Sequence, residues 1–349
     1  MRRFDFVIGN PAYQAETIGE NDTYAPPVYH LFLEEAYKIG DTVEMVHPAR
    51  FLFNAGSTPK QWNQKMLNDT HLKVLKYEAE ANKVFPNTNI NGGVAITYRS
   101  ANSTYGAIEV FAQFVELNTI RRKVVNAKDF RPFSNYVFSA YSYHLTESLY
   151  DDHPELKGKL SDGHDYDLKS NILDLMPQVF SDAKRTDNDI QILGRQENTR
   201  VFKWVNKKYI TGPANWGKYK VFLAAADGAA GTIGKPIPAR IIGVPVNGEK
   251  WSGSTESFIS IGSFETMIQA QNAIKYIQTR FARSLLSLLK ITQHITPDKW
   301  LYVPQQDFTS SSDINWNTSI ANIDRQLYKK YGLSQEEIDF IETHVKEMT

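Results

Sequence analysis

The sequence predicts an α/β fold over its first third, followed by a larger α+β region. From residue 4 to about residue 105, apolar runs of strand length alternate with amphipathic helical runs, which indicates an α/β layer with a mostly parallel sheet. Beyond about residue 115 the segments become irregular, turn-rich and aromatic. The 349 residues are enough for two hydrophobic cores. We therefore expect two domains, covering residues 1–115 and 116–349.

Apolar periodicity and turn residues place the elements of the first domain in order. The segment 4–9, FDFVIG, reads as a buried strand that runs directly into Asn-Pro-Ala-Tyr. An amphipathic helix is expected at 26–40, because its apolar residues form one stripe and Gly40 is a helix terminator. The remaining elements, taken in chain order, are a strand within 42–53 whose exit is set by Pro48, a helix at 60–69, and strands at 71–79 and 92–100.

Two helical regions stand out near the end of the chain. Residues 263–290 carry helical periodicity long enough for two helices. Residues 333–348 form a terminal helix with a capping box, in which Glu337 follows Ser334 by three positions.

Composition limits the class of protein. The chain has no cysteine, which excludes disulfides and thiolate metal sites and favours a reducing compartment. No apolar stretch is long enough to span a membrane, and the N-terminus has no signal-peptide pattern. The eight histidines are scattered, so we expect no metal site. These features predict a cytoplasmic protein that does not contact membranes.

Asn10, Pro11 and Tyr13 are the residues with the clearest chemical potential. Ligands of α/β folds bind at the carboxyl ends of the strands, where Asn10 is expected. The Asn10 amide oxygen and the Pro11 carbonyl are adjacent acceptors that suit a group with two N–H donors. Tyr13 offers a flat ring for stacking on a planar base. Two alternatives remain open: a simple Asn-Pro turn at a strand end, or a peptide-docking Asn-Pro-x-Tyr signal.

The segment FDFVIGNPAY resembles the catalytic motif of amino-methylating DNA methyltransferases, an Asn-Pro-Pro-Tyr that follows an apolar strand. The resemblance implies that Asn10 and Pro11 accept hydrogen bonds from the exocyclic amine of a flipped adenine, while Tyr13 stacks on that base. The methyl donor would be S-adenosylmethionine. Ala12 replaces the second proline, but neither acceptor is lost. Phe85 matches the aromatic residue that contacts the other face of the base in this family; alternatively, it fills the interface between sheet and helix.

The C-terminal half extends the resemblance. Residues 276–308 and 327–342 resemble the ends of adenine methyltransferases from restriction–modification systems of type IIG, which fuse cleavage and modification in one chain. The implied fold is a partial Rossmann-like methyltransferase sheet followed by an α+β target-recognition domain. The implied partner is double-stranded DNA.

The family's cofactor turn, aromatic-x-Gly-x-Gly, lies upstream of its catalytic motif, and only nine residues precede Asn10 here. The glycine-rich segment 225–236 lacks the spacing of a phosphate loop. We therefore expect a chain that is inactive alone and that is completed by a missing N-terminal methyltransferase half or a second subunit. No cofactor-binding residue can be assigned from the sequence. A DNA-recognition subunit without catalysis and a protein that docks through its Asn-Pro-Ala-Tyr strand remain as alternatives.

A basic–aromatic stretch is the predicted DNA-contacting surface. Residues 145–189 contain eleven acidic and five basic side chains, whereas residues 195–220 contain seven basic side chains and one acidic. Cations suit phosphates and rings suit bases, although a solvated strand face with core aromatics would give the same pattern. The candidate substrate-binding residues in this stretch are Lys203, Trp204, Lys207, Lys208 and Trp216.

Overall fold

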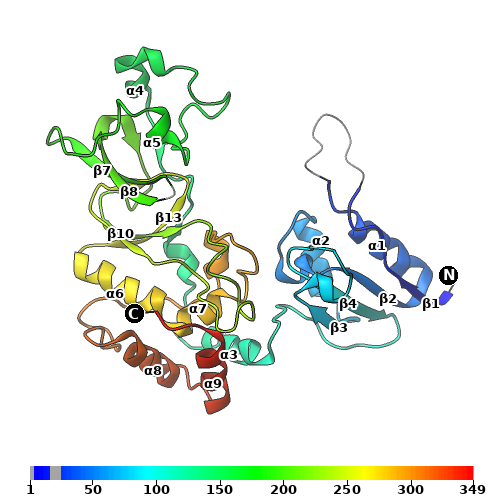
Figure 1. Ribbon diagram of the computed structural model, residues 1–349. Helices are drawn as coiled ribbons and strands as arrows, with labels where there is room; N and C mark the ends of the chain where they lie inside the picture. Colours follow the sequence, from blue (N-terminus) through cyan, green and yellow to red (C-terminus); the bar gives the residue numbers. More distant parts are fainter. Residues whose placement is uncertain (1–3, 16–24, 198, 349) are drawn as a thin grey trace. The chain divides into compact units, whose positions relative to one another are not determined.

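The computed structural model describes residues 4–15, 25–197 and 199–348. Backbone contacts divide the chain into two compact units, unit 1 up to Asn118 and unit 2 from Thr119 onward. The protein has a mixed α/β architecture with several small sheets (Figure 1).

Unit 1 is built on a four-stranded sheet with the order β1-β2-β4-β3. Its elements are β1 (Phe4–Gly9), α1 (Tyr29–Ile39), β2 (Gly40–Pro48), the 3-10 turn η1 (Arg50–Phe53), α2 (Lys60–Leu67), β3 (Leu72–Glu78), η2 (Ala81–Lys83) and β4 (Val94–Ser100). The predicted exit at Pro48 is confirmed, since β2 ends there, and residues 50–53 of the expected segment form the turn η1.

The expectation of a mostly parallel sheet is wrong. Among the described strands of this sheet, only β1 and β2 are parallel, and β4 lies between β2 and β3, antiparallel to both. The physical reason is the connection from β3 to β4, which contains only the short turn η2. A parallel return requires a crossover, usually a helix, whereas an antiparallel return does not.

The expectation of a buried first strand is also wrong. Strand β1 lies at the sheet edge, and no described strand pairs with its outer side. Phe4, Phe6 and Ile8 share one face of the strand and are 54%, 68% and 76% exposed. Alternation of side chains along a strand places Val7 on the opposite face. There Val7 packs against Gly40.

Unit 2 contains three sheets, with orders β11-β10-β13-β5, β12-β7-β8 and β6-β9. Helix α3 (Val115–Val125) crosses the boundary between the units. The remaining elements are η3 (Phe133–Tyr136), β5 (Val137–Phe138), β6 (His144–Leu145), α4 (Glu147–Asp152), η4 (Pro154–Leu156), α5 (Ile172–Leu175), β7 (Asp189–Gln196), β8 (Thr199–Asn206), η5 (Lys207–Tyr209), β9 (Ile210–Thr211), β10 (Tyr219–Ala224), β11 (Val246–Gly248), β12 (Gly253–Ser254), β13 (Phe258–Phe264), α6 (Met267–Gln278), α7 (Arg280–Leu286), η6 (Pro297–Trp300), α8 (Ile320–Lys330) and α9 (Gln335–His344).

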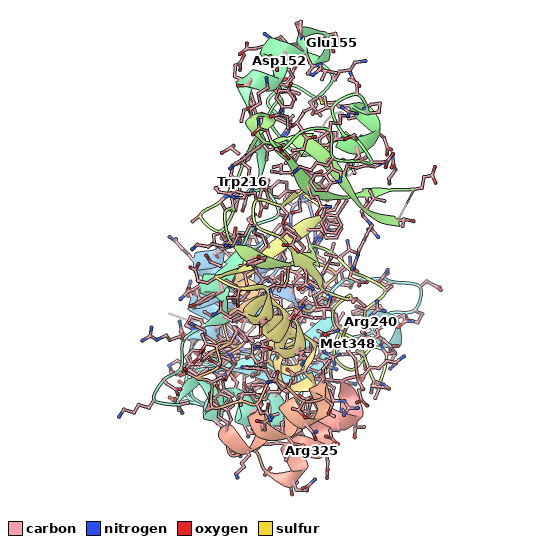
Figure 2. All side chains as sticks on the ribbon, turned by 90° about the vertical axis from the view of Figure 1, so that its left-hand side faces the viewer. Asp152, Glu155, Trp216, Arg240, Arg325 and Met348 are labelled. Carbon is pink, nitrogen blue, oxygen red and sulfur yellow. The ribbon has the colours of Figure 1, made fainter. Side chains whose placement is uncertain are left out.

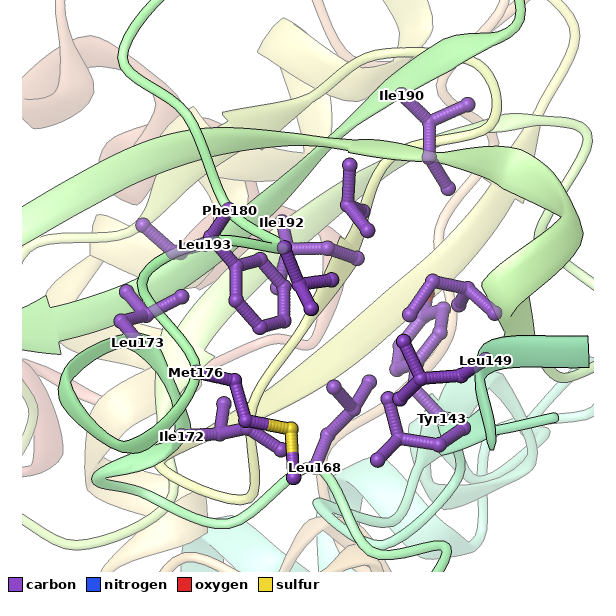
Figure 3. Packing of buried hydrophobic residues seen from close by; sticks show 14 of the residues in the cluster. Tyr143, Leu149, Leu168, Ile172, Leu173, Met176, Phe180, Ile190, Ile192 and Leu193 are labelled. Atoms are coloured by element: carbon purple, nitrogen blue, oxygen red, sulfur yellow. The ribbon is translucent and has the colours of Figure 1, made fainter. Parts of the chain in front are cut away.

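Two cores support unit 2. Helix α6 packs on β10 and β13, α8 packs on α6 and α7, and α9 packs on α7 (Figure 1). A second cluster lies between the β7–β8 hairpin and the segments that precede it, where Leu149, Ile172 and Ile192 are fully buried (Figure 3). The predicted pair of helices at 263–290 and the capping box of Ser334 and Glu337 are both confirmed.

Candidate functional site

The Asn-Pro-Ala-Tyr segment lies at the carboxyl end of β1. Strand β1 ends at Gly9, and Asn10 follows with an exposed side chain. The backbone is then tied to the segment that leads into α1, because Val28 N–H donates to the Tyr13 carbonyl at 3.1 Å and Ala15 N–H donates to the Pro26 carbonyl at 2.9 Å. These bonds fix the direction in which the chain leaves the sheet.

Tyr13 and Phe85 come together although 72 positions separate them in the chain. Their ring centroids are 6.4 Å apart and the planes make an angle of 67°, an edge-to-face contact. Phe85 is positioned by η2, since its N–H donates to the Ala81 carbonyl at 2.8 Å. The Tyr13 hydroxyl oxygen is buried and has no hydrogen-bond partner among the described residues, and burial raises its pKa.

A cavity of about 330 Å³ opens beside Tyr13. Its described walls contain one cationic side chain, Arg50, and no carboxylate. The lining residues are Tyr13, Gln14, Ala25, Pro27, Tyr29, Pro48, Arg50, Gly56, Ser57, Thr58, Asn89, Ile90 and Asn91. The cavity is therefore polar, with a positive charge on one side.

An uncharged aromatic pair supports one wall of the cavity. Tyr29 stacks on His47 with centroids 5.7 Å apart and planes 5° apart. The Nδ1 atom of His47 lies 3.1 Å from the Pro48 carbonyl, which can only accept, so Nδ1 carries the proton. Nε2 then accepts from the Thr97 hydroxyl at 2.7 Å. Burial lowers the pKa of His47 to about 4, which keeps the ring neutral near pH 7.

Sequence reasoning missed Arg50, Tyr29 and His47 as residues of this site. The available signal was the two polar residues His47 and Arg50, which flank Pro48 and Ala49 where this strand ends. Because ligands of α/β folds bind at the carboxyl ends of strands, polar residues at the end of β2 are candidate site residues in the same way as those at the end of β1.

In unit 2, the structure brings three of the five predicted DNA-contacting residues together. Lys207, Lys208 and Trp216 line one cavity of about 590 Å³, with Asn188, Asn206 and Ile210. Lys203 and Trp204 do not line it. Lys203 pairs with Asp182, and the backbone of Trp204 exchanges hydrogen bonds of 2.8 and 2.9 Å with Ser181.

The two lysines of this cavity are already engaged within the protein. Lys208 forms an ion pair with Asp152, which also accepts from the Tyr209 hydroxyl at 2.7 Å. Figure 2 shows Asp152 toward the α4 end of unit 2 and Trp216 nearer to β10. The Lys207 ammonium lies 3.1 Å from the ring centroid of Trp251. These partners reduce the free positive charge that the sequence alone suggests.

Trp251 was not predicted and is the most unusual residue near this cavity. It is 43% exposed and has a φ of +64°, a conformation that bulky residues rarely adopt. Reciprocal bonds hold it, because Trp251 N–H donates to the Trp216 carbonyl and Trp216 Nε1 donates to the Trp251 carbonyl, both at 2.9 Å. Its sequence neighbours gave no signal for this contact.

Neither a metal site nor a membrane span is found in the part of the chain that the structure describes. No group of three or more His, Asp or Glu side chains is arranged to hold a metal there. None of the described helices is both long and apolar enough to cross a bilayer.

Residues 1–85 match the family of Eco57I restriction-modification methylases. The matched range includes Asn10, Pro11, Tyr13 and Phe85. No curated protein matches the chain. Among solved structures, the type IIG restriction endonuclease BpuSI is similar with a TM-score of 0.34 and 9% identity, over 90% of this chain and 48% of that one. The chain thus spans about half the length of that enzyme, and its amino-terminal part is similar to restriction-modification methylases.

Proposed function

We propose that this chain is the catalytic and target-recognition portion of a DNA adenine methyltransferase from a restriction–modification system. The observation that carries the proposal is the position of Asn10, Pro11 and Tyr13 at the carboxyl end of β1, with Phe85 in contact with Tyr13. The match of residues 1–85 to restriction-modification methylases supports it. In this proposal, unit 1 holds the flipped adenine and unit 2 recognises the DNA target.

Each of the four candidate residues of unit 1 has a definite task in this proposal. The Asn10 amide oxygen and the Pro11 carbonyl accept the two N–H bonds of the exocyclic amine, which draws the nitrogen lone pair out of conjugation with the ring. Tyr13 and Phe85 contact the two faces of the base and offset part of the cost of unstacking it. Because the two rings now meet edge to face, they must part before a base can lie between them.

S-adenosylmethionine is the methyl donor that the proposal implies, and residues 225–236 do not fit it. Thr232 and Lys235 exchange backbone hydrogen bonds of 2.9 and 2.8 Å, which closes this segment into a turn. A Cβ on Gly231 would lie 2.5 Å from the Lys235 carbonyl oxygen, so the turn's own backbone occupies the space beside that glycine. A DNA-recognition subunit that does not itself transfer methyl groups is the second candidate function.

Binding of a short single-stranded oligonucleotide that contains one 2-aminopurine tests the proposed base site. Stacking between Tyr13 and Phe85 should quench its fluorescence, and Tyr13→Ala or Phe85→Ala should each weaken binding by about 1–3 kcal/mol. Tyr105→Ala is the matched control, because Tyr105 is an exposed tyrosine of unit 1 that does not line the cavity beside Tyr13. Equal affinity of all three variants and the wild type would contradict the proposed site.

A further inference from the structure

We propose that Arg50 binds a phosphate of the DNA strand that carries the target base, in the cavity beside Tyr13. This inference rests on the proposed function, since Tyr13 is expected to hold the base of the same nucleotide. The ligand is a phosphodiester anion, and its partner is the guanidinium of Arg50.

The state of the Arg50 side chain is the first argument. The Arg50 Nε atom is buried and has no hydrogen-bond partner, and no carboxylate pairs with Arg50 among the described residues. A buried donor without a partner costs about 1–3 kcal/mol, and more when the group is charged. A site that keeps such a donor beside an open cavity is suited to a ligand that supplies the acceptor.

The second argument is that the local backbone holds Arg50 in place. Ala55 N–H donates to the Arg50 carbonyl at 3.0 Å, which turns the chain back over the residue. Gly56 then adopts a φ of +85° directly against the Arg50 side chain, where a Cβ would lie 3.3 Å from Arg50 Cβ and 3.4 Å from Nε. Only glycine combines that backbone conformation with so close an approach. The stem of Arg50 is thus fixed without an ion pair.

The third argument is the chemistry of the cavity. Ser57, Asn89 and Asn91 also line it and offer neutral hydrogen-bond donors, and the lining contains no acidic side chain that would repel an anion. A guanidinium matches the oxygen geometry of a phosphate with two parallel N–H bonds. Tyr13 also lines the cavity, and its buried hydroxyl oxygen likewise has no partner among the described residues. A nucleotide whose base lies at Tyr13 would supply hydrogen-bond acceptors to this cavity through the phosphate oxygens of its sugar–phosphate backbone.

A double-mutant cycle with neutralised phosphates tests the inference. The probes are short single-stranded oligonucleotides with one adenine among thymines, in which the phosphate on either the 5′ or the 3′ side of the adenine is replaced by a neutral methylphosphonate. In the wild-type chain, one of the two replacements should weaken binding about tenfold, as expected for a charged hydrogen bond. In Arg50→Gln, the same replacement should have no further effect, and the salt slope should be shallower by about 0.7.

Lys76→Gln is the matched control, because Lys76 is an exposed cation of unit 1 that does not line the cavity. This variant should keep the full methylphosphonate penalty. Should Arg50→Gln lower the melting temperature so far that binding cannot be measured, Arg50→Lys keeps the charge but not the planar fork, and its penalty should fall below that of the wild type. A penalty of equal size in the wild type and in the folded Arg50 variant overturns the inference, as does the absence of any penalty in the wild type.

The same oligonucleotides separate this inference from the proposed function. If the base site is wrong but the phosphate site exists, Tyr13→Ala and Phe85→Ala keep wild-type affinity while Arg50→Gln still removes the penalty. If the phosphate site is wrong but the base site exists, Tyr13→Ala and Phe85→Ala weaken binding while Arg50→Gln leaves the penalty unchanged.

Discussion

The ring of Tyr13 meets the ring of Phe85 edge to face, at a centroid distance of 6.4 Å, while the buried Tyr13 hydroxyl has no partner within the described ranges of the chain. The contact joins the end of the first strand to the turn η2 that follows the third, two segments far apart in the chain. It places the two aromatic residues that we propose to contact opposite faces of one base within reach of each other.

Removal of the Tyr13 hydroxyl should leave the fold intact. Because this buried hydroxyl forms no hydrogen bond with any residue that the structure describes, Tyr13→Phe should not lower the melting temperature, and a small rise is expected. A thermal melt of the variant beside the wild type measures this. A drop of several degrees would show that the hydroxyl has a partner in the folded protein.

His47 should make unit 1 sensitive to acid. Burial lowers its pKa to about 4, from about 6.5 for a histidine exposed to water. His47 is therefore protonated below about pH 6.5 in the unfolded chain, but only below about pH 4 in the folded chain. Because the unfolded chain binds more protons between these values, the free energy of unfolding falls as the pH falls through this window. The loss amounts to about 3 kcal/mol. Hydrogen exchange of the β2 amides, compared between wild type and His47→Gln, measures it. An equal pH dependence in both proteins would exclude His47 as the cause.

The exposed face of β1 should tolerate substitution by a charged residue. Phe6 is 68% exposed, so Phe6→Lys should change the free energy of unfolding by less than about 0.5 kcal/mol and should reduce self-association through the strand edge. Val7→Lys is the control, because Val7 packs against Gly40 on the opposite face and should not tolerate a charge. Chemical unfolding and light scattering of both variants give the answer. Strong destabilisation by Phe6→Lys would mean that this face is covered.

If the cavity of unit 2 binds DNA, the affinity for DNA should depend on salt through Lys207 and Lys208. If Lys207 and Lys208 contact phosphates, their joint replacement by Ala should make the slope of log affinity against log salt shallower by up to about two units on double-stranded DNA. Lys208 must leave Asp152 to do so, and Asp152→Asn should therefore strengthen DNA binding. Gel shifts over a salt series measure both effects. A wild-type slope in the double-lysine variant would place the DNA-contacting surface elsewhere.

Local signals in the sequence were sufficient for the strands of unit 1, for its helices α1 and α2, for α6, α7 and α9 in unit 2, and for part of the candidate site. The end of β1 at Gly9 follows from the Asn-Pro pair, and the capping box of Ser334 and Glu337 fixes the start of α9. The insertion of β4 between β2 and β3 depends on pairing between distant segments, which local periodicity does not encode. Burial of the first strand was mispredicted for a related reason, since an apolar strand at a sheet edge reads like one at the centre.

The unpredicted residues depend on tertiary contacts. Arg50 becomes distinctive only when its Nε atom is seen to be buried without a partner, and Trp251 only when its φ and its bonds to Trp216 are known. Charge counts overstated the basic stretch, because Asp152 and Asp182 are distant from Lys208 and Lys203 in sequence but pair with them in space.

Discrimination of the adenine amine by Asn10 tests the central claim most directly. Two oligonucleotides that differ only in one base, adenine or unsubstituted purine, are compared for binding to the wild type and to Asn10→Ala. The wild type should prefer adenine, because only adenine offers the amine to the Asn10 and Pro11 oxygens, and Asn10→Ala should lose most of that preference while keeping its melting temperature. Equal affinity of the wild type for the two oligonucleotides, or an undiminished preference in Asn10→Ala, would contradict the account.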